Sequence, residues 1–270
     1  MVTSRLSSKF KIISGTNQTV FHGHCLKGLT ALSSNSVDIV ITSPPYNIGV
    51  KYRTYKDKKG MHHYLKWLHQ IFSEVKRILK DEGSLFLNFG STNMNPWLAY
   101  DAANNLRDLF MLQNHIVWVK SISIGETTYG HFKPINSPRF TNHTYEEIFH
   151  FTKNGDVGID RLSIGVPYMD KSNIAKKADS LDLRCRGNSW FIPYKTIRSR
   201  NERGHHPAIY PKQLVENCIK LAGYDDDTVV CDPFLGSGTT LVVAEQLGIN
   251  GFGIELDEVY LKYAEKRIAA

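Results

Sequence analysis

Short apolar runs alternate along most of the chain with longer segments in which apolar residues recur every three or four positions. The short runs are bounded by polar turns, which is the pattern of buried parallel strands. In the first half of the chain they predict strands at residues 19–22, 37–42, 84–88 and 116–119. Between the second and third strands, residues 61–79 carry apolar side chains at helical spacing, and Asp81-Glu82-Gly83 ends the pattern. Residues 96–109 predict a second helix, with Pro96 near its first turn.

The C-terminal part repeats the alternation. It predicts helices at residues 211–221, 238–247 and 257–268, separated by strands at 228–231 and 251–255. Strands that alternate with helices in this way favour an α/β fold, with helices on both faces of a doubly wound, mostly parallel sheet.

The middle of the chain breaks the pattern. Residues 121–203 show no clear helical period, and residues 171–203 contain nine Lys or Arg against three acidic residues, with Trp190, Phe191 and Tyr194 among them. Two interpretations stay open: a solvated surface excursion, or a DNA-facing region whose cations neutralise phosphates. We therefore predict one catalytic domain made of residues 1–120 and 204–270, interrupted by an inserted basic DNA-recognition region at 121–203.

Composition bears on which kinds of partner the protein binds. The formal net charge of +7 over 270 residues fits a basic protein of no special partner or one that binds a polyanion such as nucleic acid. No apolar run approaches the roughly 20 residues of a membrane span, and the first residues lack the apolar core of a signal peptide. The four cysteines form no C-x-x-C pair, so we expect free thiols in a reducing compartment, no metal site and no membrane association.

A glycine-containing turn follows the predicted strand at 228–231. It reads Asp232-Pro233-Phe234-Leu235-Gly236-Ser237-Gly238-Thr239-Thr240 and leads into a helix. Its glycines allow a tight turn and a close approach of backbone to a ligand, although a simple turn has the same pattern. Glu255 ends the next strand, where ribose hydroxyls are commonly bound. No Gly-Lys-Ser/Thr follows, so the turn favours a nucleoside ligand without a triphosphate.

A proline-stiffened turn, Ser43-Pro44-Pro45-Tyr46, follows the strand at 37–42. Two prolines fix φ and remove two N–H donors, which leaves rigid acceptors beside an aromatic ring. Such a turn suits a flat base that carries an amino group. A stiff loop with a partly buried tyrosine is the other interpretation.

Together, the two turns resemble those of the amino-group DNA methyltransferases. The order, with the catalytic motif before the cofactor motif, resembles their circularly permuted β-class branch, and the likeness covers most of the chain. Residues 118–120 and 142–146 also resemble elements of this family. One departure lies at Gly23 and His24, where related chains often carry Gly-Asp near the cofactor adenine.

The resemblance implies a Rossmann-like fold and S-adenosylmethionine as cofactor. It implies that the target base is flipped out of the duplex, that Tyr46 stacks on it, and that Ser43 and the Pro44 carbonyl accept hydrogen bonds from its amino group. Asp232 would orient the cofactor loop or bind the methionine amino group, or alternatively would only cap a helix. The implied catalytic residues are Ser43, Pro44, Pro45 and Tyr46, and the implied cofactor-binding residues are Asp232, Pro233, Phe234, Gly236, Ser237, Gly238, Thr239, Glu255, His206 and Pro207.

The substrate implied by the resemblance is a specific double-stranded DNA sequence. Ser at position 43 mostly accompanies the N4 nitrogen of cytosine in this family, and adenine N6 is the alternative. Methylation of RNA or of a protein amide, and a DNA-binding module with an inactive fold, remain further alternatives. The predicted DNA contacts are Lys51, Arg53, Lys56, Arg184, Arg186, Arg198 and Arg200. We also expect a possible homodimer and a possible cognate restriction endonuclease. The expected location is the cytoplasm of a bacterial or archaeal cell, beside the nucleoid.

Overall fold

A computed structural model describes residues 10–130, 135–176, 181–193 and 209–270. Within these residues one large sheet has the strand order β1-β2-β11-β10-β3-β4-β8-β5-β9. Its strands are β1 (Phe10–Ile12), β2 (Gln18–His22), β3 (Val37–Thr42), β4 (Leu79–Phe89), β5 (Met111–Val119), β8 (Tyr145–Thr152), β9 (Ser189–Phe191), β10 (Val229–Asp232) and β11 (Asn250–Glu255).

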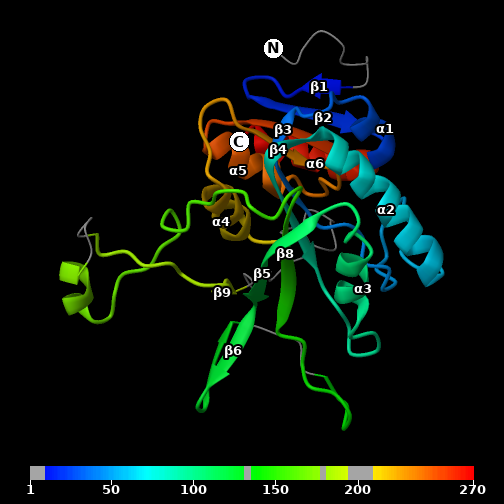
Figure 1. The fold of residues 1–270 in the computed structure, drawn as a ribbon. Coiled ribbons are helices and arrows are strands. Elements are labelled where there is room, and N and C mark those ends of the chain that lie inside the picture. The colour runs from blue at the N-terminus through cyan, green and yellow to red at the C-terminus, as the bar shows by residue number, and fades with distance from the viewer. Residues whose placement is uncertain (1–9, 131–134, 177–180, 194–208) are drawn as a thin grey trace.

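Five adjacent strands, β2, β11, β10, β3 and β4, are parallel to one another. β1 is antiparallel to β2, β8 is antiparallel to both β4 and β5, and β9 is parallel to β5. Helices cover both faces of this sheet (Figure 1). The helices are α1 (Cys25–Thr30), α2 (Met61–Ile78), α3 (Leu98–Asn104), α4 (Lys212–Ala222), α5 (Thr239–Gln246) and α6 (Glu258–Ile268). The predicted doubly wound, mostly parallel α/β fold is therefore confirmed.

Each face has its own apolar core because side chains of a strand alternate between faces. Leu85 and Leu87 of β4 pack with α1, α2 and α3, whereas Phe86 packs with α4 and α5 on the other side. A further cluster joins α5 to α6. No helix in the described ranges is both long and apolar enough to cross a bilayer.

The middle of the chain differs from the prediction. Residues 121–203 were predicted as an insertion with no assigned strands, yet β8 lies between β4 and β5, and β9 pairs with β5. Outside the sheet lie the antiparallel hairpin of β6 (Ser121–Ile124) and β7 (Thr127–Gly130), which extends beyond β5 and β8 in Figure 1, and the short 3-10 helix η1 (Lys171–Lys176).

Two predicted boundaries also shift. The helix predicted at 96–109 is confined to α3, Leu98–Asn104, because residues 105–110 continue as tight turns rather than as helix. The strand predicted at 84–88 begins earlier, at Leu79, with an irregular register against β3.

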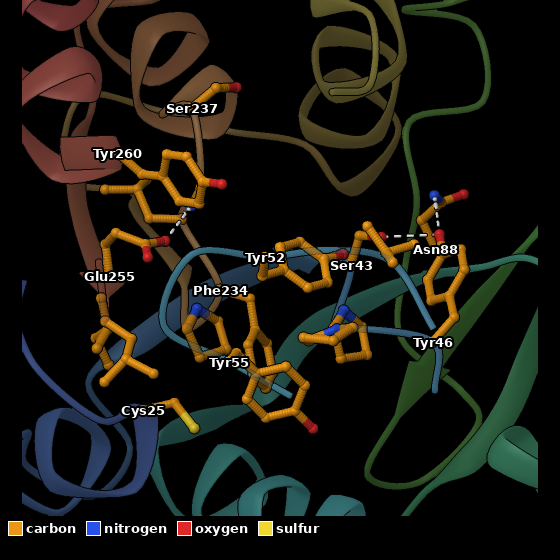
Figure 2. A pocket seen from close by; sticks show the side chains of 18 of the residues that line it. Cys25, Ser43, Tyr46, Tyr52, Tyr55, Asn88, Phe234, Ser237, Glu255 and Tyr260 are labelled. Carbon is orange, nitrogen blue, oxygen red and sulfur yellow. Dashed lines mark hydrogen bonds between the residues drawn. The ribbon is translucent and has the colours of Figure 1, made fainter. Parts of the chain in front are cut away.

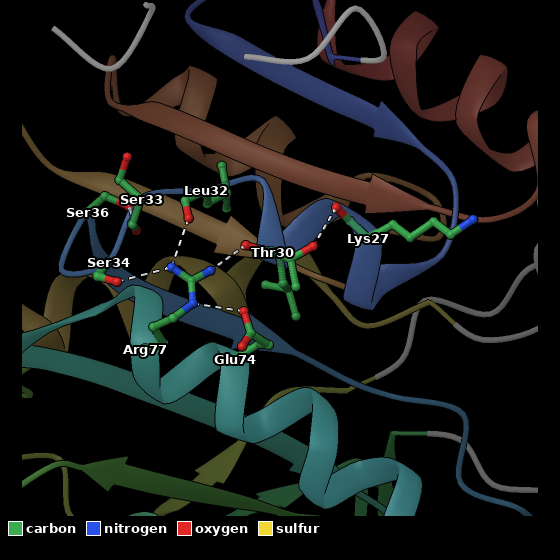
Figure 3. Close-up of polar contacts among 9 residues, drawn as sticks. Lys27, Thr30, Leu32, Ser33, Ser34, Ser36, Glu74 and Arg77 are labelled. Carbon is green, nitrogen blue, oxygen red and sulfur yellow. Dashed lines mark hydrogen bonds and ion pairs between the residues drawn. The ribbon is translucent and has the colours of Figure 1, made fainter. Parts of the chain in front are cut away.

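A single arginine ties α1 to α2 (Figure 3). The Arg77 guanidinium donates to the backbone carbonyl oxygens of Leu29 at 2.8 Å and Leu32 at 2.9 Å, where α1 ends. It also donates to Glu74 Oε2 at 2.8 Å. A cation is well placed here because carbonyl groups at a helix C-terminus lack intrahelical partners. This contact holds α1, which follows β2, against α2, the long helix after the proline turn.

Candidate active site

The two predicted turns start side by side. Strands β3 and β10 are parallel neighbours, so both turns leave the sheet at the same edge. At that edge Thr42 Oγ1 donates to Asp232 Oδ1 at 2.8 Å, which links the last residues of the two strands. The geometry needed for a shared site is therefore present.

A cavity of about 270 Å³ lies between the turns (Figure 2). The strand ends bring most of the predicted site residues to its wall. Those that line it are Ser43, Pro44, Pro45, Tyr46, Pro233, Phe234, Gly236, Ser237, Thr239 and Glu255.

Two residues predicted to bind the cofactor do not line this cavity. Asp232 is fully buried and accepts hydrogen bonds from Thr42, Thr240, Tyr210 and the Phe234 backbone N–H. Its burial raises its pKa, and its role here is to hold the loop in place.

Gly238 is the second of these residues. It precedes α5 in a left-handed conformation with φ of 80°, and a Cβ there would lie 2.8 Å from Ala264 Cβ. Glycine is therefore required for the turn and for close packing of α5 on α6, rather than for approach to a ligand.

Glu255 presents a carboxylate to one end of the cavity. Its Oε2 accepts from the Gly236 N–H at 2.8 Å and its Oε1 from the Asp257 N–H at 2.7 Å. Burial raises its pKa. The carboxylate thus has a fixed orientation from which it can accept hydrogen bonds from the hydroxyls of a ribose.

His24 stands at the same end, where related chains often carry Asp. Its Nδ1 accepts from the Leu26 N–H at 3.3 Å and so caps α1, as a carboxylate would. Burial lowers its pKa, and nearby Lys59 and Lys27 lower it further, which favours the neutral imidazole that can accept this bond. His24 also lines the cavity.

The loop after the proline turn forms another wall, which includes Val50, Tyr52 and Tyr55. One buried carboxylate organises it: Asp57 accepts from four consecutive backbone N–H groups, those of residues 47–50, at 2.7–3.2 Å. Tyr55 in turn stacks on Trp67 of α2, with ring centroids 5.7 Å apart. From the sequence this loop was either a solvated charged loop or one that contacts DNA and closes over the flipped base, and in the structure its aromatic side chains line the cavity.

At the opposite end, the Tyr46 ring stacks on Phe89 with centroids 4.5 Å apart. Its hydroxyl lies 2.8 Å from Ser43 Oγ and donates to Glu146 Oε2 at 3.0 Å. Asn88 Nδ2 donates to both the Tyr46 hydroxyl and Glu146 Oε2, at 2.9 and 2.8 Å. The catalytic motif is therefore held by side chains from β4 and β8. Figure 2 shows Ser43 and Asn88 at the Tyr46 hydroxyl.

Cys25 is the one thiol in the cavity wall that the described residues form. Burial raises its pKa to about 12, so it is a protonated thiol near neutral pH and a poor nucleophile. It also lies towards the Glu255 end rather than beside Tyr46 (Figure 2). The geometry favours direct transfer to a substrate over covalent catalysis by cysteine.

The predicted DNA contacts are scattered. Lys51, Lys56 and Arg184 are exposed, whereas Arg186 donates through Nε to the Ile164 carbonyl at 2.8 Å. Arg53 lies with its Nε 3.5 Å from Asp257 Oδ2, so it pairs with the N-cap of α6 in this structure. Arg198, Arg200, His206 and Pro207 lie outside the described residues.

The sequence missed Asn88, Glu146, Tyr52 and Tyr55. Asn88 could have been found, because it ends the strand next to β3 and the carboxyl ends of parallel strands share an edge. Glu146 stood in a segment singled out only for its resemblance to a family element. Nothing in the local sequence indicates that Tyr52 and Tyr55 line a cavity, because that depends on how their loop folds against the rest of the protein.

The strand-end cavity, with a stiff acceptor turn on one side and a fixed carboxylate at a strand end on the other, is typical of an α/β methyltransferase. A family model described as DNA methylase matches residues 37–266, and the chain belongs to this family. It is an S-adenosylmethionine-dependent DNA methyltransferase.

Relatives and solved structures agree with this assignment. The type II methyltransferase M.HpaI of Haemophilus parainfluenzae is 30% identical over 93% of this chain and 74% of its own length. The DNA adenine methyltransferase YhdJ of Escherichia coli (strain K12) is 28% identical over 93% of this chain and 82% of its own.

Among solved structures, the cytosine-N4-specific PvuII DNA methyltransferase superposes with a TM-score of 0.71 at 20% identity, covering 93% of this chain and 86% of that one. The putative DNA modification methylase TTHA0409 of Thermus thermophilus, solved in complex with S-adenosyl-L-methionine, gives 0.63 at 23% identity, covering 93% and 92%. At these identities the superpositions show the shared fold.

The residues of the cavity fit the cofactor. Phe234, Tyr55 and Trp67 offer aromatic surfaces for an adenine ring, and Glu255 offers acceptors for ribose hydroxyls. The bound sulfonium would supply an activated methyl group. The protein's own contribution is to exclude water and to align a nucleophilic nitrogen with that group.

Proposed function

We propose that the protein transfers a methyl group from S-adenosylmethionine to N4 of a cytosine that has been flipped out of a specific double-stranded DNA sequence. The observation that carries the proposal is the position of the Ser43–Tyr46 turn. It lies one strand away from the cofactor loop, joined to it through Thr42 and Asp232, and lines the same cavity.

The chemistry required of the turn is acceptance of hydrogen bonds from an amino group. Ser43 Oγ and the Pro44 carbonyl are acceptors at the cavity wall, and Tyr46 is a ring on which a flat base can stack. Hydrogen bonds from the amino hydrogens to these acceptors draw the nitrogen towards tetrahedral geometry and make its lone pair available to the methyl carbon. Serine rather than aspartate at position 43 supports cytosine.

Adenine N6 is the second candidate. The similarity to YhdJ, a DNA adenine methyltransferase, favours it, and the same acceptors suit either amino group. Incubation of duplex DNA with deuterated-methyl S-adenosylmethionine, followed by mass spectrometry of the nucleosides, separates the two. The proposal expects labelled N4-methylcytosine; labelled N6-methyladenine would replace the base assignment, and unlabelled DNA would refute the function.

We further propose that recognition of the DNA sequence involves the β6–β7 hairpin and residues 153–176 and 181–188, described parts of the basic middle segment that lie outside the sheet. Exposed Lys51, Lys56 and Arg184 would contact phosphates, and Arg186, Arg198 and Arg200 extend the same expectation. Replacement of any one of these cations by a neutral residue should reduce the salt dependence of DNA affinity by about one unit of logarithmic slope.

The relatives named as type II methyltransferases support a role in restriction and modification, with a cognate endonuclease that cuts the same sequence. DNA methylated by this protein should then resist one specific endonuclease. The homodimer stays a prediction, which sedimentation of the protein with and without DNA would test.

A further inference from the structure

The hydrogen bonds beside Tyr46 have only one consistent direction, and Glu146 sets it. A carboxylate accepts and cannot donate. Glu146 Oε1 accepts from Lys120 Nζ at 3.0 Å, and its Oε2 accepts from the Tyr46 hydroxyl and from Asn88 Nδ2. The side chains of Glu146 and Lys120 are only 14% and 17% exposed, so this ion pair is shielded from water.

This direction fixes the serine. Because the Tyr46 hydroxyl gives its proton to Glu146, its oxygen is an acceptor for its other partners. Asn88 Nδ2 donates to it, and the Ser43 hydroxyl, 2.8 Å away, must donate to it as well. Ser43 Oγ therefore has its proton committed to Tyr46, and only its lone pairs remain for a substrate.

The same direction fixes the asparagine. Both hydrogens of Asn88 Nδ2 are used, one by Tyr46 and one by Glu146, so the amide cannot rotate by 180° without placing its oxygen against the carboxylate. Asn88 is 3% exposed and lines the cavity, yet its Oδ1 is buried without a hydrogen-bond partner among the described residues. A buried acceptor left unpaired destabilises the protein, and a hydrogen-bond donor from a ligand would remove that penalty.

We infer that Asn88 Oδ1, rather than the Pro44 carbonyl, is the second acceptor, so that Asn88 Oδ1 and Ser43 Oγ accept the two amino hydrogens of the flipped base. Glu146 is the positioning residue that keeps both groups as acceptors. This inference rests on the proposed function and names the residues that recognise its substrate. It also explains rejection of bases with an exocyclic oxygen: a carbonyl at the same place would face two acceptors, with no proton between them.

The test exchanges the amide of Asn88 and the carboxylate of Glu146, first one at a time and then together. In Glu146→Gln, Lys120 retains the remaining oxygen, and the new NH₂ faces Asn88. The Asn88 amide must then turn to accept from it, which places a donor in the cavity where the acceptor stood. The variant should transfer methyl groups about 100-fold more slowly under single-turnover conditions, the scale of losing one preorganised group from a catalytic site. Its affinity for S-adenosylmethionine should stay at the wild-type value.

Asn88→Asp alone should also lose activity, because it places a second carboxylate beside Glu146. The double variant Asn88→Asp with Glu146→Gln restores a donor–acceptor pair of the same net charge. One oxygen at position 88 accepts from the new amide and the other faces the cavity. Its transfer rate should return to within about tenfold of wild type, which a merely structural role for Glu146 does not predict.

Glu147→Gln is the matched control. Glu147 is the next residue of β8, buried on the opposite face, where it accepts from Tyr100. This variant should keep wild-type transfer, and thermal melting with cofactor-binding calorimetry shows that every variant is folded. Wild-type transfer by Glu146→Gln, or a double variant no faster than the slower single variant, would overturn the inference. Absence of methyl transfer to DNA by the wild-type protein would instead refute the proposed function, and this inference with it.

Discussion

The loop that closes the cavity depends on one carboxylate, so Asp57→Asn should weaken cofactor binding. Asp57 Oδ1 accepts from the Asn47 N–H at 2.7 Å, and its Oδ2 accepts from the next three N–H groups at 3.0–3.2 Å. Asparagine has nearly the same shape, but one of its two acceptor oxygens becomes a donor that faces backbone donors. The change therefore removes bonds without creating a void.

The magnitude follows from these contacts. At minimum the Asn47 bond is lost, and a hydrogen bond to a charged group contributes about 1.5–3 kcal/mol. The three bonds to the other oxygen lose their charge assistance, which roughly halves bonds of this kind, so the closed loop loses at least about 3 kcal/mol in all. Since each 1.4 kcal/mol is tenfold in affinity, the dissociation constant for S-adenosylmethionine should rise by about 100-fold or more.

Calorimetric titration of the cofactor measures this directly. Thermal melting of the same samples should show little change, because the loop lies outside both faces of the core. Lys58→Gln, an exposed neighbour in the same loop, is the control and should bind as wild type does. A folded Asp57→Asn variant that binds S-adenosylmethionine with wild-type affinity would show that the loop does not depend on this carboxylate.

Three further changes test other parts of the structure. Arg77→Met removes two hydrogen bonds to backbone carbonyls, so it should lower the free energy of unfolding in urea by about 2–3 kcal/mol without altering cofactor affinity. An unchanged free energy of unfolding would show that Arg77 does not stabilise the contact between α1 and α2. Burial lowers the pKa of His150 to about 4, against 6.5 in the unfolded chain, so between pH 6.5 and 4 the unfolded state binds a proton that the folded state does not, and stability falls as the pH decreases. Over that range the free energy of unfolding of wild type should fall by about 3 kcal/mol more than that of His150→Gln. Equal losses would contradict burial of a neutral ring. Tyr46→Ala should weaken binding of a duplex with a mismatched target base by about 1–3 kcal/mol, the contribution of stacking, whereas Tyr46→Phe should bind that duplex as wild type does. Equal affinities of wild type and both variants would show that Tyr46 is not part of the base-binding site.

The pattern of apolar positions predicted the parallel half of the sheet because each of its strands is a local signal. The strand at 37–42 is β3 residue for residue, and the helix at 61–79 differs from α2 by one residue. In the antiparallel half, the predicted strand at 116–119 is the end of β5, whereas β8 was missed. The pairing of β8 with β4 and β5 joins segments far apart in the chain, and no local period reports such a pairing.

The site divides in the same way. Ser43–Tyr46 and the loop after Asp232 were predictable because they follow their strands directly, and neighbouring strands bring them together. For Asp232 the sequence left three roles open, because it shows the residue type but not its partners; the four protein groups that bind it favour the first, orientation of the cofactor loop. Glu146 lies 100 residues from the tyrosine it orients, so only the folded sheet could show the contact.

The most direct test of the central claim is a crystal structure of the protein with S-adenosylhomocysteine. The account predicts that its ribose hydroxyls meet Glu255 and that its sulfur faces the Ser43–Tyr46 turn, leaving room for a base nitrogen to approach a methyl carbon at about 3–3.5 Å. A sulfur atom directed away from Ser43, or a ligand bound outside the cavity between the two turns, would contradict it.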